Sequence, residues 1–348
     1  MSKRNYDFNK FDEFNDFVFN DDKIEEKKLF IPWVEKFRPK KIDDLISNEQ
    51  ITNTLKDYVK IKYLPHLLIC GPSGTGKTSI INALANELYG NYAGMLTLQI
   101  NASEERGIEI IRNKVKDFVM SKNIFLEANC VNFKLVILDE ADAMTISAQG
   151  MLRRMIEDYT FNARFCLICN KLKNIDPAIQ SRCVSFRFSP LNKKDIYNKI
   201  INICNQENLK YDKDGLELLI KIAHGDMRKV LNNLQLVNMG YKNININSVS
   251  KCLNYPIKED IILIYDIIKR NKLNIALDKV TKIINEKQYL LIDIINELHE
   301  ILINEFKNDK INKDKFSKII LNLKNVENNT LVSTSEKLLL SIFISSFY

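Results

Sequence analysis

Short apolar runs alternate with segments of helical spacing from residue 66 onward. Four of the runs are continuous enough to form buried strands: HLLIC (66–70), MLTLQI (95–100), KLVILD (134–139) and RFCLIC (164–169). The segments between them that place apolar side chains at helical spacing are 77–89, 107–120 and 147–159. Strands with no polar alternation, separated by helices, predict a parallel sheet that is covered on both faces.

The strand pattern ends after FSPL at 188–191, and helical patterns follow. Residues 191–240 predict about three short helices, and 257–348 predict longer ones. A chain of 348 residues is too long for one compact core. We therefore expect an α/β domain at 30–190 and two helical domains, at 191–250 and 251–348.

The first 29 residues differ from the rest, because phenylalanines recur every three positions among Asp, Glu and Asn. That spacing drifts around a helix, so the composition predicts a disordered N-terminal extension. A segment that docks a partner is the alternative.

Composition narrows the class of protein only slightly. The net charge of +7, from 51 basic and 44 acidic residues, is too small to indicate nucleic-acid binding by itself. Seven scattered cysteines favour a reducing compartment over a disulfide framework. No secretory signal is visible, and the longest apolar run near the C-terminus, 338–347, is shorter than the ~18 residues of a membrane span. We expect a soluble intracellular protein without a membrane partner.

The clearest motif is GPSGTGKT at 71–78, which follows one predicted strand and opens a helix. Glycines let successive backbone N–H groups face phosphate oxygens, the lysine reaches the β- and γ-phosphates, and the threonine hydroxyl ligates Mg²⁺. The motif predicts an ATP site. Its nucleotide-binding residues are Gly71, Pro72, Ser73, Gly74, Thr75, Gly76, Lys77, Thr78 and Ser79.

Polar residues also follow two later strands of the predicted sheet. Asp139 and Glu140 end one strand, where Asp139 would hold Mg²⁺ through water and Glu140 would accept a proton from the attacking water. The alternative is that they and Asp142 cap the following helix. Asn170 ends the next strand and would orient the water near the γ-phosphate; the alternative is that it only starts a turn.

Two arginines stand at positions that need an explanation. Arg228 follows Gly225 and Asp226 at the start of a helix, where its charge opposes the helix dipole unless an anion compensates. We expect it to contact the γ-phosphate, with a plain surface arginine as the alternative. Arg182 lies between two small residues at the entry to an alternating strand. Pairing with a nearby carboxylate is one explanation for it.

Cys166 and Cys169 form a C-x-x-C pair, but residues three apart on a strand point to opposite faces. We therefore expect neither redox chemistry nor zinc binding there.

Together these residues resemble the AAA+ ATPases, and more narrowly the small subunits of replication factor C, the eukaryotic clamp loader. The segments that carry the resemblance are PWVEKFRPKKIDDL (32–45), LPHLLICGPSGTGKTS (64–79), INASEERGIEIIRNKVKDF (100–118), LVILDEADAMTISAQGMLRRMIE (135–157) and IQSRCVSFRFSPL (179–191). The chain looks most like the small subunit that has both an intact P-loop and an intact SRC motif, here Ser181, Arg182 and Cys183. Two positions depart from the family pattern: Ser73 replaces proline or asparagine, and Gly150 lies within a helix at a cost of about 1 kcal/mol.

The resemblance implies a P-loop domain followed by a helical lid (191–250) and a helical collar (251–348). It implies a nuclear heteropentamer that uses ATP and Mg²⁺ to open a sliding clamp and load it on primer–template DNA in replication and repair. Each ATP would lie between neighbouring subunits, with Arg182, assisted by Arg164, acting in trans on the neighbour's ATP. The residues implied to wrap the adenine are Trp33, Val34, Arg38 and Ile46, with core packing as the alternative for Trp33; those implied to track DNA phosphates are Arg106 and Arg112.

Two other functions stay open from the sequence. One is a structural subunit of the same complex that binds ATP with little hydrolysis. The other is a different DNA-associated AAA+ ATPase, which would predict a winged-helix domain in place of the helices at 257–348.

Overall fold

The computed structural model describes residues 31–46, 49–104, 108–121, 131–309, 311–330 and 335–348. These fall into two compact units. The first comprises the chain up to Leu191 together with Asp226–Asn232, and the second comprises Asn192–Gly225 and Asn233–Tyr348. Both predicted helical regions contribute to the second unit; the division into three domains stays a prediction.

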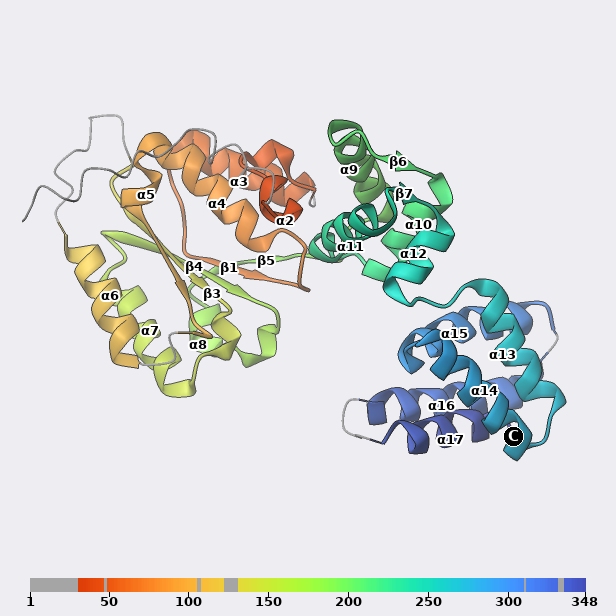
Figure 1. Ribbon diagram of the computed structural model, residues 1–348. Helices are drawn as coiled ribbons and strands as arrows, with labels where there is room; N and C mark the ends of the chain where they lie inside the picture. The colour runs from red at the N-terminus through yellow and green to blue at the C-terminus, as the bar shows by residue number, and fades with distance from the viewer. Residues whose placement is uncertain (1–30, 47–48, 105–107, 122–130, 310, 331–334) are drawn as a thin grey trace, which may run out of the picture. The chain divides into compact units, whose positions relative to one another are not determined.

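The first unit is built on a parallel sheet of five strands (Figure 1). The strands are β1 (Leu67–Cys70), β2 (Thr97–Asn101), β3 (Lys134–Asp139), β4 (Ala163–Cys169) and β5 (Val184–Arg187), in the order β2-β3-β4-β1-β5. Every neighbouring pair is parallel. The predicted parallel sheet is therefore confirmed. Strand β2 begins two residues later than predicted, because Ala93–Leu96 form the short helix α5.

Alternate residues of each strand face different helical layers. Leu67 and Ile69 pack with α3 (Glu49–Ile61) and α4 (Lys77–Tyr89), whereas Leu68 and Cys70 pack with α6 (Ile108–Met120) and α7 (Ile146–Asp158). The same alternation places Cys166 in one core and Cys169 in the other. The prediction that the two thiols face opposite sides is confirmed, and the six cysteines of the described residues are all free.

Short elements connect these layers in the first unit. They are α2 (Trp33–Lys36), η2 (Ile42–Asp44), η3 (Gly90–Tyr92), η4 (Ala141–Ala143), η5 (Leu172–Asn174) and α8 (Pro177–Gln180). The long helices follow the sequence pattern closely: α4 has the predicted bounds, and α6 and α7 begin within one residue of them. Helix α7 runs through Gly150 without interruption, so the glycine there only lowers helix propensity.

The three helices predicted within 191–240 are α9 (Lys193–Gln206), α10 (Lys213–Ala223) and α11 (Met227–Tyr241), and α12 (Ile246–Leu253) follows them. The prediction that strands end after 191 is wrong in one detail. The two-residue strands β6 (Lys210–Tyr211) and β7 (Asn243–Ile244) pair in parallel, because two connections between helices meet there. Asp212 N donates to Ile244 O beside this pair.

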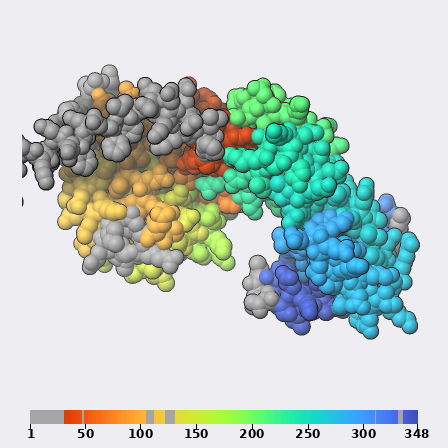
Figure 2. Space-filling model, viewed as in Figure 1, coloured from red at the N-terminus to blue at the C-terminus, as the bar shows by residue number. Residues whose placement is uncertain are grey.

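The rest of the second unit is helical, as predicted. Its helices are α13 (Lys258–Arg270), α14 (Leu273–Lys287), α15 (Leu291–Lys307), α16 (Lys313–Thr330) and α17 (Glu336–Ser345). They share one core, which includes Ile264, Leu298 and Phe343, and they form the closely packed blue body of Figure 2. A search of the described residues finds no helix with the length and apolarity that crossing a membrane requires.

Candidate nucleotide-binding site

The predicted ATP-site residues meet at the carboxyl edge of the sheet. Strands β1, β3 and β4 are neighbours, and the P-loop, Asp139 and Asn170 follow their last residues. This edge lies outside the carboxyl ends of parallel strands, where open α/β sheets bind ligands. Chain segments roughly a hundred residues apart are thus brought to one place by strand order alone.

The P-loop turns between β1 and α4 through glycines with left-handed backbone conformations. Gly74 and Gly76 have φ values of 66° and 89°, a region that L side chains rarely adopt. A Cβ added at Gly74 would lie 1.7 Å from Asp226 Oδ1. The loop therefore needs glycine at position 74 for conformation and for space.

Lys77 is 7% exposed and points back into the loop that precedes it. Its Nζ donates to Gly71 O (2.9 Å), Pro72 O (2.7 Å) and Asn170 Oδ1 (2.9 Å). Burial lowers the pKa of Lys77, although the negative charge of Asp139 acts in the opposite direction. A phosphate arriving here would meet a poorly hydrated ammonium group, which strengthens the electrostatic attraction.

The Thr78 hydroxyl donates to Asp139 Oδ2 at 2.8 Å, which joins the start of α4 to the end of β3. Asp139 Oδ1 accepts from the backbone N–H of Glu140 at 2.9 Å. A hydroxyl and a carboxylate are the hard oxygen donors that Mg²⁺ prefers, so the predicted pair of metal residues fits this ion. Glu140 is exposed and adopts a left-handed conformation, with φ of 53°.

Asp142 has a role that differs from helix capping. Its two carboxylate oxygens accept from Asn170 N (3.3 Å) and Lys171 N (3.1 Å), so Asp142 holds the segment that follows β4. The side chain that caps α7 is Thr145, whose Oγ1 accepts from Ala148 N. The alternative that the carboxylates after β3 cap the next helix is therefore wrong. Asn170 does start a turn, and its side chain also bonds Lys77.

The start of α11 belongs to the first unit and contacts the P-loop. Asp226, 9% exposed, caps α11 by accepting from Arg228 N (2.9 Å) and Lys229 N (3.2 Å). It also accepts from Ser73 Oγ at 2.9 Å, and Met227 N donates to Gly74 O at 3.1 Å. No local sequence pattern indicated the bond between Ser73 and Asp226, since the two residues are 153 positions apart.

Arg228 is exposed, and its positive charge is a minor factor that lowers the pKa of Lys77 after burial. The two cations are thus near enough to repel each other, and a bound anion would relieve this repulsion. This favours the phosphate contact over the alternative of a plain surface arginine, although the contact itself stays a prediction.

The residues expected to wrap the adenine lie in the segment before α3. Trp33, 8% exposed, packs edge-on against Phe37 with ring centroids 6.2 Å apart, so it has a packing role of its own. Val34 and Ile46 are half-buried, and Arg38 pairs with Glu35 at 3.2 Å.

Leu45 connects this segment to the ATP site, because a Cβ on Gly76 would lie 3.2 Å from its Cδ2. The segment therefore reaches the P-loop, but no described contact tests the adenine role itself. Of the two arginines expected to track DNA, Arg112 is exposed on α6, and Arg106 lies outside the described residues.

The two arginines expected to act in trans lie at the opposite, amino edge of the sheet. The Arg164 guanidinium donates to the carbonyls of Leu64, Thr160 and Ala163 and stacks on Phe133, with 4.8 Å to the ring centroid. These contacts hold Nε and Nη1 of Arg164 within its own unit, and the expected assisting role stays a prediction.

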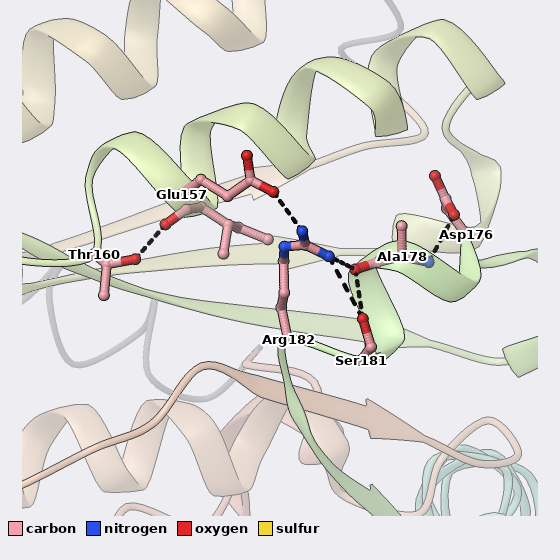
Figure 3. Close-up of polar contacts among 7 residues, drawn as sticks. Glu157, Thr160, Asp176, Ala178, Ser181 and Arg182 are labelled. Atoms are coloured by element: carbon pink, nitrogen blue, oxygen red, sulfur yellow. Dashed lines mark hydrogen bonds and ion pairs between the residues drawn. The ribbon is translucent and has the colours of Figure 1, made fainter.

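Arg182 pairs with a carboxylate, which was one explanation for it from the sequence alone. Its Nη2 lies 2.6 Å from Glu157 Oε1, and its Nη1 donates to Ala178 O at 2.6 Å (Figure 3). The side chain stays 39% exposed. The guanidinium is therefore held by its own chain and still open to solvent.

His66 lies at the same edge and is buried. Its Nδ1 accepts from Phe165 N at 3.1 Å, and its Nε2 lies 3.4 Å from Thr160 Oγ1. Burial, and then the nearby charge of Arg164, lowers the pKa of His66 to about 4. Nδ1 can accept only when it is unprotonated, so the fold requires the neutral ring.

Sequence comparison identifies the relatives of this chain. Residues 67–191 match the family model of the ATPase family associated with various cellular activities (AAA). A putative replication factor C small subunit of Acanthamoeba polyphaga mimivirus is 45% identical over 80% of this chain and 83% of its own length. The probable replication factor C subunit 5 of Dictyostelium discoideum is 40% identical over 92% of both chains. Human replication factor C subunit 5 is 40% identical over 91% of both.

Among solved structures, the Holliday junction branch migration motor RuvB of Thermotoga maritima superposes with a TM-score of 0.51. It is 17% identical, and the match covers 70% of this chain and 85% of that one. Identity this low shows that the two share a fold. The predicted AAA+ fold is confirmed by the family match together with this likeness.

Proposed function

Because the chain belongs to the replication factor C subunits within the AAA ATPase family, we propose that it is an ATP-hydrolysing subunit of a clamp loader. In this function it acts with other replication factor C subunits in a heteropentamer. The complex opens a sliding clamp and places it on primer–template DNA. Its setting is replication and repair in the nucleus.

The observation that supports the proposal is a pair of side-chain hydrogen bonds within the ATP site. Lys77 donates to Asn170 at 2.9 Å, and Thr78 donates to Asp139 at 2.8 Å. Four groups with distinct catalytic duties thus converge from three strand ends. A subunit that only held ATP would have no use for a water-orienting amide beside the lysine, so this arrangement favours hydrolysis.

The residues of the site divide the work of phosphoryl transfer. Lys77 neutralises charge on the β- and γ-phosphates, while the backbone N–H groups of the P-loop and the start of α4 bind their oxygens. Asn170 orients the attacking water, and Glu140 accepts its proton. Thr78 and Asp139 hold Mg²⁺, which supplies further charge neutralisation when bound.

Two arginines complete the proposal, and each acts on a different ATP. Arg228 serves the chain's own ATP from the start of α11. Arg182 serves the ATP of the adjacent subunit, because its guanidinium lies at the amino edge of the sheet, away from the P-loop, and stays partly exposed. Charge supplied in this way is what an arginine finger contributes to phosphoryl transfer.

The proposal also includes the residues that the sequence predicts to contact adenine and DNA. The segment of Trp33, Val34, Arg38 and Ile46 binds the adenine. Arg112, exposed on α6, and Arg106 bind phosphates of the primer–template duplex. Such contacts supply affinity without sequence preference, which suits a loader that acts at any primer end.

The proposal is tested by clamp retention in the complex assembled from this chain and the subunits that co-purify with it. We expect ATP to drive retention of the clamp on primed circular DNA. A Glu140→Gln complex should bind ATP and stall before release, because proton transfer is lost. Retention and turnover that are unchanged by Glu140→Gln would contradict the proposal, as would co-purification without any other replication factor C subunit.

A further inference from the structure

At the amino edge of the sheet, Glu157 pairs with Arg182. The proposed function assigns this arginine to the ATP of a neighbouring subunit. Figure 3 shows Arg182 reaching from the segment after α8 toward the end of α7, where Glu157 lies. The contact joins Arg182 Nη2 and Glu157 Oε1 at 2.6 Å. Nη1 is placed independently, by Ala178 O at 2.6 Å and by Ser181 Oγ at 3.5 Å. Three acceptors from two helical segments thus fix the plane of the guanidinium.

Helix stability does not explain a carboxylate at this position. Glu157 and Asp158 occupy the last turn of α7, which contains no basic residue. Negative charge there is unfavourable, because the carbonyl end of a helix is itself negative. The buried side of α7 is supplied by other residues, among them Leu152 and Ile156. By itself, the negative charge of Glu157 therefore destabilises helix α7.

Fold stability does not explain the ion pair either. The side chains of Arg182 and Glu157 are 39% and 46% exposed. Pairs with this much solvent contribute little to the free energy of unfolding. Such a pair does fix the direction of the guanidinium, because an arginine has many rotamers in solution and a partner on a rigid helix selects among them.

Helix α7 also connects this contact to the chain's own ATP site. It begins shortly after Asp139 and Glu140, and its 13 residues span about 20 Å. Near its start, Gln149 accepts from Asp176 N at 2.7 Å and donates to Asn174 O at 2.9 Å. Asp176 caps α8, the helix that precedes Arg182. One helix thus links the acidic residues of this ATP site to both supports of Arg182.

From this geometry we propose that Glu157 is a positioning residue for Arg182, orienting its guanidinium toward the ATP of the adjacent subunit. The inference rests on the proposed function, since it requires that Arg182 act in trans. Because α7 begins shortly after Asp139 and Glu140 and carries Glu157 in its last turn, this one rigid helix connects the chain's own ATP site to the residue that positions Arg182.

The test is a double-mutant cycle in the full assembled complex, with clamp and primed DNA present. Glu157→Gln keeps the shape of the side chain and removes its charge. We expect kcat for ATP to fall about 3- to 10-fold, since the arginine is present but poorly oriented, with the KM for ATP unchanged. Glu157→Asp should recover part of the loss. Asp158→Asn is the matched control, because it makes the same charge change one residue later and should have no effect.

The decisive comparison is made in an Arg182→Ala background. There Glu157→Gln should produce no additional loss, because the residue it positions is gone. An equal loss in both backgrounds, no loss in the wild-type background, or the same loss from Asp158→Asn would overturn the role of Glu157. If Arg182→Ala itself leaves turnover unchanged, the trans role in the proposed function fails instead.

Discussion

At the carboxyl edge of the sheet, the helix that follows the P-loop begins. The first N–H groups of a helix lack partners and carry partial positive charge, so this edge attracts anions. Lys77 lies there and donates to Gly71 O and to Asn170 Oδ1, and the Thr78 hydroxyl donates to the Asp139 carboxylate. Phosphates are therefore favoured at this edge. The hydrogen bonds already present hold in position the side chains that would bind them.

At the amino edge, α6 and α7 end and present carbonyls. Lys134, 3% exposed, donates to Phe118 O and Ser121 O at 2.6 Å each at the end of α6. Arg164 donates to Thr160 O after the end of α7. These cations satisfy the unpaired carbonyls of helix ends, as expected from the helix dipole.

The contrast has one cause, because helices that connect parallel strands run opposite to them. The starts of α4, α6 and α7 therefore lie at one edge, and their ends lie at the other. The amino edge needs cations for the chain's own structure, and Arg182 differs from Arg164 in staying 39% exposed with a carboxylate as its partner. The comparison shows that Arg182, unlike Arg164, pairs with a carboxylate and keeps an exposed side chain, which is what the proposed action in trans requires.

The largest effect is expected from Arg182. An arginine supplied in trans is worth roughly 10³–10⁵ in the rate of phosphoryl transfer. We expect the purified chain to hydrolyse ATP slowly, the assembled complex to hydrolyse it rapidly, and Arg182→Ala to remove most of the gain at the neighbouring site. Steady-state ATPase assays measure this, with Arg270→Ala, 78% exposed in the second unit, as control. Full turnover by the chain alone would refute the expectation.

A smaller loss of ATPase rate is expected from a substitution at the carboxyl edge. Lys77→Ala removes the cation that faces the β- and γ-phosphates, and a lost electrostatic contact of this kind costs about 10²–10³ in rate. Nucleotide affinity, measured by fluorescence titration, should fall as well. Lys60→Ala, at a side chain 74% exposed, provides the control. Affinity equal to wild type would remove Lys77 from the phosphate site.

His66 tests the structural role of the amino edge through pH. Its pKa is lowered to about 4 from 6.5, so the unfolded chain binds the proton first as pH falls. Stability is therefore lost from about pH 6.5 downward, by roughly 2 kcal/mol between pH 7 and pH 5.

His66→Asn offers an acceptor that does not titrate, so its stability should lose less over that pH range than the wild type does. Urea unfolding of the full chain at both pH values measures the difference. Equal losses in the two proteins would mean that another group carries the acid sensitivity.

The smallest effect is expected at Arg112, which lies on neither edge and is exposed on α6. Arg112→Ala should weaken binding of primer–template DNA by the complex a few-fold and reduce the salt slope by about 1, as loss of one phosphate contact does. ATP affinity should stay at the wild-type value. Unchanged DNA binding across a salt series would exclude Arg112 from the DNA contacts.

Local signals made much of the first unit predictable. The P-loop glycines and the helix after them are consecutive in sequence, so α4 was predicted from Lys77 to Tyr89 and lies there. Strand β2 was predicted two residues early, because the apolar pattern does not distinguish the end of α5 from the start of a strand. The pair β6 and β7 escaped prediction, since two residues per strand carry no periodicity.

Side-chain partners were less predictable than elements. Asp142 was considered as a helix cap, yet it bonds the backbone after β4, because strand order brings that segment beside it. The hydroxyl of Ser73 donates to Asp226, a partner that the sequence analysis did not indicate. Neither partner lies within one helical turn in the sequence, so no local pattern could identify it.

The sequence by itself determined the phosphate-binding loop, the alternation of strands and helices, and the residue types at each strand end, because these depend on neighbours along the chain. The tertiary structure decided which cations are engaged and which stay available. Arg164 and Arg182 look alike in sequence, 18 positions apart in the same domain. Only the folded chain surrounds the first with three carbonyls and leaves the second on a half-exposed carboxylate. Burial and helix direction, which are properties of the packed sheet, make that difference.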